Sequence, residues 1–139
     1  MELILAVAML AIILAIAIPR FDVPLTTKLR LENETRRIQA DLFLTRRLAI
    51  THRDTYILKV YPVKNEYAIF KNRVVPQNQI GETRIIKTQI SASGDNNFIF
   101  ELLGNLAANS GTNLNLSSGV YQYEISVIIP TGKVNITEL

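Results

Sequence analysis

A single carboxylate stands directly before a long apolar run at the start of this chain. Glu2 precedes residues 3–18, which are all apolar, and Pro19 follows them. A carboxylate that enters an apolar medium loses its hydration, so such a residue usually acquires a partner of opposite charge. At the start of a helix the same charge also stabilises the helix dipole. The chemistry that this pattern indicates is charge pairing.

Residue types that carry catalysis or bind metals are sparse. The chain has one histidine, His52, and no cysteine, which excludes a His-Cys pair, a His-Glu-x-x-His helix and a thiolate metal site. The stretch 104–112 lacks the Gly-Lys-Ser/Thr of a phosphate loop, and the oxygen-rich residues 95–97 are more typical of a polar turn than of a calcium site. We therefore expect no catalytic residue, no metal ligand, no cofactor and no enzyme activity.

The apolar run predicts a helix that is apolar around its whole circumference. Helices of water-soluble domains are usually apolar on one face, whereas a helix in lipid is apolar all round. We predict a membrane anchor formed by Leu3, Ile4, Leu5, Val7, Leu10, Ile12, Ile13, Leu14, Ile16 and Ile18. At about 1.5 Å per residue the run measures roughly 24 Å, short of a hydrocarbon core of roughly 30 Å, so we expect a few more residues upstream.

Two other interpretations of the apolar run remain open. The triplet Ala15-Ile16-Ala17 matches the small-x-small pattern of a signal-peptide cleavage site, which would leave a soluble periplasmic β protein. Against this, the expected basic residues before the run are absent and a carboxylate takes their place. A plain single-pass anchor would explain the hydrophobicity but neither Glu2 nor its spacing to Pro19.

The spacing of Glu2 and Pro19 resembles the prepilin-type N-terminus of type IV pilins and type II secretion pseudopilins. In that family a basic leader ends in Gly and is followed by Phe-Thr-Leu, one more apolar residue and a glutamate. Met1 takes the place of that apolar residue, Glu2 that of the glutamate, and Pro19, in Ala17-Ile18-Pro19, that of the family's proline. The resemblance implies that Glu2 pairs with the N-terminal amine of an adjacent subunit, and that prepilin peptidase acts if the true start lies upstream.

Residues 25–54 predict a second, amphipathic helix beyond a proline break. Pro19 and Pro24 bracket the break, and an apolar stripe then recurs at steps of three and four residues, through Ile38, Leu42, Thr45 and Ala49. We expect the other faces to be solvated, where the charged residues are Arg36, Arg37, Asp41, Arg46 and Arg47. The alternative for the arginines is contact with neighbouring subunits or with anionic lipid head groups.

Beyond residue 54 the pattern changes from helical to alternating. We predict strands over residues 56–61, 66–70, 84–90, 97–101, 113–116, 121–129 and 133–137. The turn Pro130-Thr131-Gly132 predicts a C-terminal hairpin. The expected fold class is α+β: a long N-terminal hydrophobic and then amphipathic helix, followed by an antiparallel β-sheet or β-sandwich. The segments are 1–24 for anchoring and assembly, 25–54 for the stalk and 55–139 for a periplasmic β domain.

This layout resembles the minor pseudopilins of the GspH/FimT group. The resemblance implies a minor pseudopilin of a type II secretion system, held in the inner membrane by one helix, with its C-terminal domain in the periplasm or at the cell exterior. Its partners would be other pilins or pseudopilins in a helical filament, the inner-membrane assembly platform and membrane lipid. A minor type IV pilin for pilus assembly or DNA uptake is the alternative. Nucleic acid is not expected, because only Lys133 is basic near the C-terminal hairpin.

Overall fold

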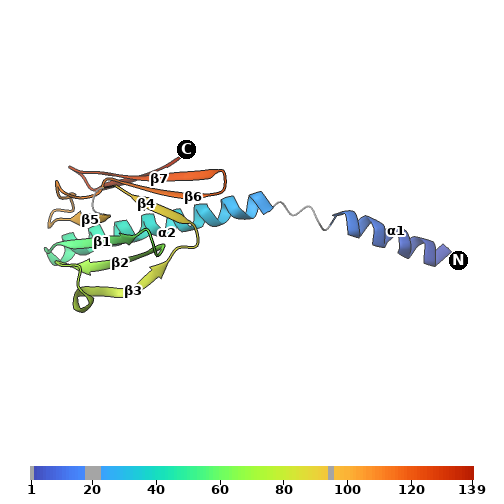
Figure 1. Ribbon diagram of the computed structural model, residues 1–139, viewed down its shortest axis with the longest axis horizontal. Helices are drawn as coiled ribbons and strands as arrows, with labels where there is room; N and C mark the ends of the chain where they lie inside the picture. The colour runs from blue at the N-terminus through green and yellow to red at the C-terminus, as the bar shows by residue number, and fades with distance from the viewer. Residues whose placement is uncertain (1, 18–22, 94–95) are drawn as a thin grey trace.

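Two helices precede eight strands in the computed structural model, which describes residues 2–17, 23–93 and 96–139 (Figure 1). Most of the apolar run forms α1 (Glu2–Ala17). The second helix, α2 (Val23–His52), runs alongside the strands, whereas α1 lies at the end of the molecule away from them. The fold is α+β, with one long helix followed by antiparallel sheets, in agreement with the predicted class.

The strands form two antiparallel sheets of four strands each. The first sheet has the order β3-β2-β1-β5 and the second has the order β4-β6-β7-β8. Their bounds are β1 (Tyr56–Tyr61), β2 (Glu66–Lys71), β3 (Gln79–Ile85), β4 (Gln89–Ala92), β5 (Asn97–Phe100), β6 (Asn113–Ser118), β7 (Tyr121–Ile128) and β8 (Lys133–Glu138). The last two strands form the C-terminal hairpin that the sequence predicts, with Ile128 opposite Lys133.

One stripe of α2 is buried against both sheets. The helix contacts β1 and β5 of the first sheet and β6, β7 and β8 of the second. The predicted stripe is confirmed, since its four residues are at most 1% exposed, and burial extends back to Leu31 and Thr35. The buried hydroxyls of Thr35 and Thr45 donate hydrogen bonds to the carbonyl oxygens of Leu31 and Asp41 one turn earlier. The two hydroxyl groups are therefore hydrogen-bonded within the helix and can be buried without an unsatisfied donor.

The core fills the space between α2 and the inner faces of the sheets. Alternate residues of the strands point inward, as the two-residue period requires. The first sheet contributes Leu58, Phe98 and Phe100, and the second contributes Leu114 and Ile125, all of which are fully buried. Together with the helix stripe they form one contiguous cluster. The main core is therefore shared by the two sheets, and a smaller buried cluster of Ile57, Ala68 and Phe70 lies on the other face of the first sheet.

The predicted single strand over residues 84–90 is wrong. The chain leaves the first sheet at Ile85 and enters the second at Gln89. Between them, the backbone amides of Lys87 and Thr88 and the Thr88 hydroxyl all donate to the carboxylate of Glu34 on α2. These bonds replace the ladder bonds of a strand, so the chain turns toward the helix and changes sheets. A second difference is that β3 begins at Gln79, five residues before the strand start that the sequence predicts at residue 84.

Two turn glycines adopt the left-handed conformation in contrasting surroundings. Gly119, between β6 and β7, has a φ of +64° and no atom near the position of a Cβ. Gly132, between β7 and β8, has a φ of +61°, and a Cβ there would collide with the carbonyl oxygen of Gly104. The second glycine is therefore needed both for its backbone conformation and for a close approach of two loops.

We expect Gly132→Ala to destabilise the protein far more than Gly119→Ala. Both changes incur the left-handed penalty of about 1 to 2 kcal/mol. Only Gly132→Ala adds an overpacking term, of about 1 to 3 kcal/mol. Urea unfolding of the full chain in a mild neutral detergent, followed by circular dichroism, measures the difference. Equal losses in the two variants would contradict the close contact.

Candidate assembly surface

The surface of α1 is apolar on every side. Apolar side chains point outward around the helix, with exposed fractions of 77% for Leu3, 71% for Ile4, 60% for Ile12 and 62% for Ile13. At 100° per residue these positions spread over the whole circumference, so no single face is set aside for packing on the protein's own sheets. None of the helices in the described ranges is both long and apolar enough to cross a membrane.

The predicted assembly residues are only partly described by the structure. Glu2 is the first residue of α1, but its side chain, like those of Leu5, Leu14 and Ile16, lies outside the described part. Ile18 and Pro19 fall wholly outside the described residues. The predicted apolar residues whose side chains are described, namely Leu3, Ile4, Val7, Leu10, Ile12 and Ile13, are all exposed. The structure brings none of them against the β-sheets.

The start of α2 continues this exposed apolar character. Leu25 and Leu29, one turn apart, are 58% and 49% exposed. Two residues further, the helix begins to bury side chains, starting with Leu31. The apolar surface available to a partner therefore covers α1 and the first two turns of α2, beyond which one stripe of α2 is buried against the sheets.

A buried polar cluster fixes α2 to the first sheet. Asp41 is 5% exposed, and its Oδ2 accepts a hydrogen bond of 2.5 Å from the Tyr67 hydroxyl and one of 2.6 Å from the Arg84 guanidinium. Burial, and then the neighbouring Asp41 carboxylate, raise the pKa of Tyr67 strongly. The hydroxyl stays protonated and donates, as the carboxylate requires.

The burial of Asp41 corrects the expectation of a solvated side chain. The signal was present in the periodicity, since Asp41 lies three residues after Ile38 and four before Thr45, both of which are on the stripe. Its partners Tyr67 and Arg84 come from β2 and β3, and nothing local in the sequence links them to the helix. Arg46 is a second correction, because it is half-buried and its Nε donates a 3.0 Å hydrogen bond to the Gly104 carbonyl.

An ion pair ties the N-terminal part of α2 to the second sheet. Lys28 lies 2.5 Å from the carboxylate of Glu138 on β8. This hydrogen bond raises the pKa of Lys28 and lowers that of Glu138. Both side chains are well exposed, so the pair orients the end of β8 more than it stabilises the fold.

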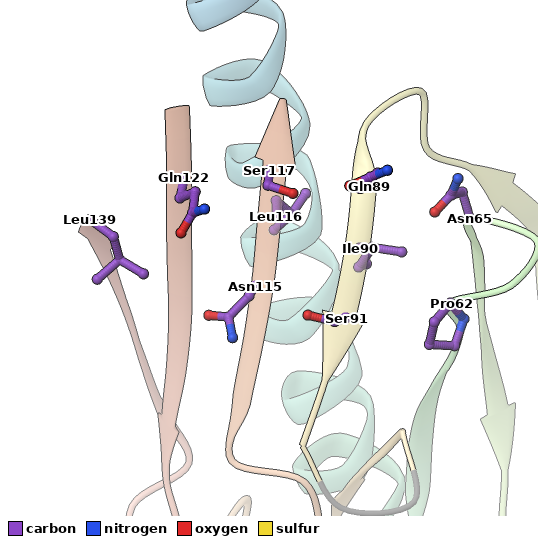
Figure 2. Close-up of a pocket in the computed structure, with 10 residues that line it drawn as sticks. All are labelled: Pro62, Asn65, Gln89, Ile90, Ser91, Asn115, Leu116, Ser117, Gln122 and Leu139. Carbon is purple, nitrogen blue, oxygen red and sulfur yellow. The ribbon is translucent and has the colours of Figure 1, made fainter. Parts of the chain in front are cut away.

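The outward face of the second sheet carries a shallow groove of about 480 Å³ (Figure 2). Its side chains come from neighbouring strands in register, with Gln89 opposite Ser117 and Ser117 opposite Gln122. Pro62 and Asn65 close it on the side of the first sheet. The lining side chains are amides, hydroxyls and apolar groups. The amides and hydroxyls can form hydrogen bonds, but none of these groups transfers protons near neutral pH. The groove therefore has the chemistry of a contact surface.

The arrangement of helix and sheets is similar to that of a solved structure, the minor pseudopilin EpsH from the type 2 secretion system of Vibrio cholerae. The two chains align with a TM-score of 0.59 and 9% sequence identity, over 78% of this chain and 97% of that one. The fold is pseudopilin-like. No family model matches the sequence, and no curated protein matches it. At 9% sequence identity, the similarity between the two chains is a similarity of fold alone.

We expect Asp41→Asn to destabilise this pseudopilin-like fold by roughly 2 kcal/mol. The change leaves Arg84 without its counter-charge. Breaking a fully buried pair costs about 3 to 5 kcal/mol, and partial exposure of Arg84 lowers that figure. Glu32→Gln is the matched control, because it removes one carboxylate from an exposed pair with Arg36 on the same helix, worth about 0.5 kcal/mol. Urea unfolding of both variants tests this, and similar losses would contradict a structural role for the cluster.

The raised pKa of Tyr67 predicts a loss of stability in alkali. Its pKa is about 10 in the unfolded chain and higher in the folded protein, so the stabilisation is complete below pH 10 and declines as the pH rises above that value. The unfolded state then loses a proton that the folded state retains. Above pH 10 the wild type should lose up to about 1.4 kcal/mol more per pH unit than Tyr67→Phe. Parallel pH profiles of unfolding free energy for the two proteins would refute the assignment.

Proposed function

We propose that this chain is a minor pseudopilin of the GspH/FimT type, a subunit that joins a helical filament through α1 and displays its two sheets at the filament surface. The observation that carries the proposal is the exposure of apolar side chains all around α1 in a molecule with a pseudopilin-like fold. A helix of this kind requires surroundings that are apolar on all sides. Membrane lipid before assembly, and the helices of neighbouring subunits after it, meet that requirement.

Assembly in this proposal transfers α1 from one apolar environment to another. The subunit is held in the inner membrane by α1, and its C-terminal domain lies in the periplasm. A rotation and rise that do not close on themselves place successive copies head to tail, which generates a filament. The assembly platform of the inner membrane and the other pseudopilins are the partners. The chain has no catalytic role and takes no cofactor.

In this proposal, Glu2 sets the axial position of each incoming subunit relative to its neighbour. In the low dielectric of a helix bundle, a carboxylate at the end of α1 is stabilised only where a positive group meets it. The N-terminal amine of an adjacent subunit provides such a group and occurs once per subunit. Charge pairing at this point would align each incoming subunit with the one before it. The proposed system is a type II secretion pseudopilus, since the similar fold belongs to a minor pseudopilin of such a system.

We expect Glu2→Ala to leave the chain in the membrane and to impair its incorporation into filaments. Removing the charge lowers the cost of placing α1 in lipid, so the membrane-bound fraction stays the same or rises. Losing the pairing should reduce co-isolation of partner pseudopilins about tenfold, equivalent to about 1.4 kcal/mol. The measurement is a pull-down of the tagged full chain from membranes that contain the pseudopilins of the same secretion system.

Glu82→Ala is the matched control, because it removes one carboxylate from an exposed position on β3. This variant should retain both membrane association and partner recovery. If Glu2→Ala recovers partners as well as the control does, the charge pairing is wrong. If the wild-type chain fails to enter membranes at all, the filament proposal itself fails.

A further inference from the structure

Three cationic side chains line one open hollow beside the start of α2. The hollow has a volume of about 520 Å³, and its lining includes Arg30 and Arg37 of α2 and Lys87 of the β3–β4 connection. The two arginines are seven residues, or about two turns, apart, so they point in nearly the same direction, about 10 Å apart along the helix axis. Lys87 reaches the helix because its backbone amide donates a 3.0 Å hydrogen bond to Glu34.

None of these three cations forms an ion pair with a side chain that the structure describes. The ion pairs of the described residues involve Lys28, Arg36, Lys71 and Arg84, and none involves Arg30, Arg37 or Lys87. All three are exposed. The hollow's one carboxylate, Glu34, already accepts hydrogen bonds from Lys87 and from Thr88, which contributes both its amide and its hydroxyl. Among the described residues, the hollow thus carries an excess of positive charge that no ion pair neutralises.

The hollow also has an apolar side. Leu29 is part of its lining, and Leu25 lies one turn nearer to α1 on the same side of the helix. Both leucines are about half exposed. Along the chain, the order is therefore the apolar α1, two exposed leucines and then the three cations. A ligand that matches this order has an apolar part next to an anionic group.

We propose that this hollow binds the phosphate head group of an anionic phospholipid, with Arg30, Arg37 and Lys87 contacting the phosphate and Leu25 and Leu29 contacting the first part of the acyl chains. The inference rests on the proposed function, in which α1 lies in a membrane. Arginine guanidinium groups and a lysine ammonium group are the donors that recognise phosphate. Clusters of basic residues next to a membrane helix attract anionic lipid. The head group would hold the start of α2 at the membrane surface until a neighbouring subunit takes its place.

The test is a lipid titration of the full chain in neutral detergent, followed by native mass spectrometry. Phosphatidylglycerol and phosphatidylcholine with identical acyl chains are compared, and the wild type should bind the anionic lipid at least about tenfold more tightly. The triple variant R30Q/R37Q/K87Q should lose roughly 30-fold in affinity for phosphatidylglycerol, with little change for phosphatidylcholine. The control K64Q/R73Q/K133Q removes the same number of exposed, unpaired cations elsewhere in the described chain, and it should keep the wild-type preference.

Equal affinity of the wild type for the two lipids would overturn the proposal, and so would an equal loss of preference in the two triple variants. Competition by millimolar inorganic phosphate that removes the lipid completely would assign the hollow to a free anion and overturn the lipid assignment. Flotation of the full chain with vesicles of pure phosphatidylcholine separates this proposal from the filament function. The wild type and both triple variants should float equally if α1 is the anchor, whatever the hollow binds.

Discussion

The fold depends on a single helix stripe that two sheets share. The inner face of each sheet is apolar, and the described residues offer no second helix to cover either of these faces, so α2 must bury both at once. The stripe is continuous from Leu31 to Ala49 and contains no exposed position. Burial of apolar area on this scale is the dominant favourable term in folding. Removing α2 would expose the inner faces of both sheets and so remove the main core.

Polar side chains on the edges of the stripe determine how the sheets are oriented on the helix. Apolar packing is non-directional, and it would tolerate a helix that slides or rotates by part of a turn. The cluster around Asp41 and the hydrogen bonds to Glu34 tolerate neither movement, because their geometry is specific. Glu34 also sets the topology, since the bonds that it accepts end one strand and direct the chain into the other sheet. Specificity and stability thus come from different residues of the same helix.

Much of this arrangement could be predicted from local patterns in the sequence. The stripe of α2, the terminal hairpin and most strands follow from residue periodicity, which depends only on neighbours along the chain. The division of residues 84–90 between two sheets could not be predicted, because it results from a bond to a residue more than fifty positions away. The partners of Asp41 and Arg46 are distant in the same way. The apolar character of α1 was evident from the sequence, and the assembly roles of Glu2 and Pro19 stay predictions. Lys87 lies far from Arg30 and Arg37 in the sequence, and only the fold gathers the three.

The polar contacts of α2 also have a mechanical consequence. Glu34, Asp41 and Arg46 lie along about 18 Å of helix, and they bind three different segments of the β domain. A force applied along the helix axis would load these contacts in parallel and in shear, together with the buried stripe between them. A hairpin that is pulled apart from one end loses its hydrogen bonds one after another. The contacts of α2, loaded together, would all have to break at once. The sheets would therefore move with α2 as a rigid load when the helix is displaced along its axis.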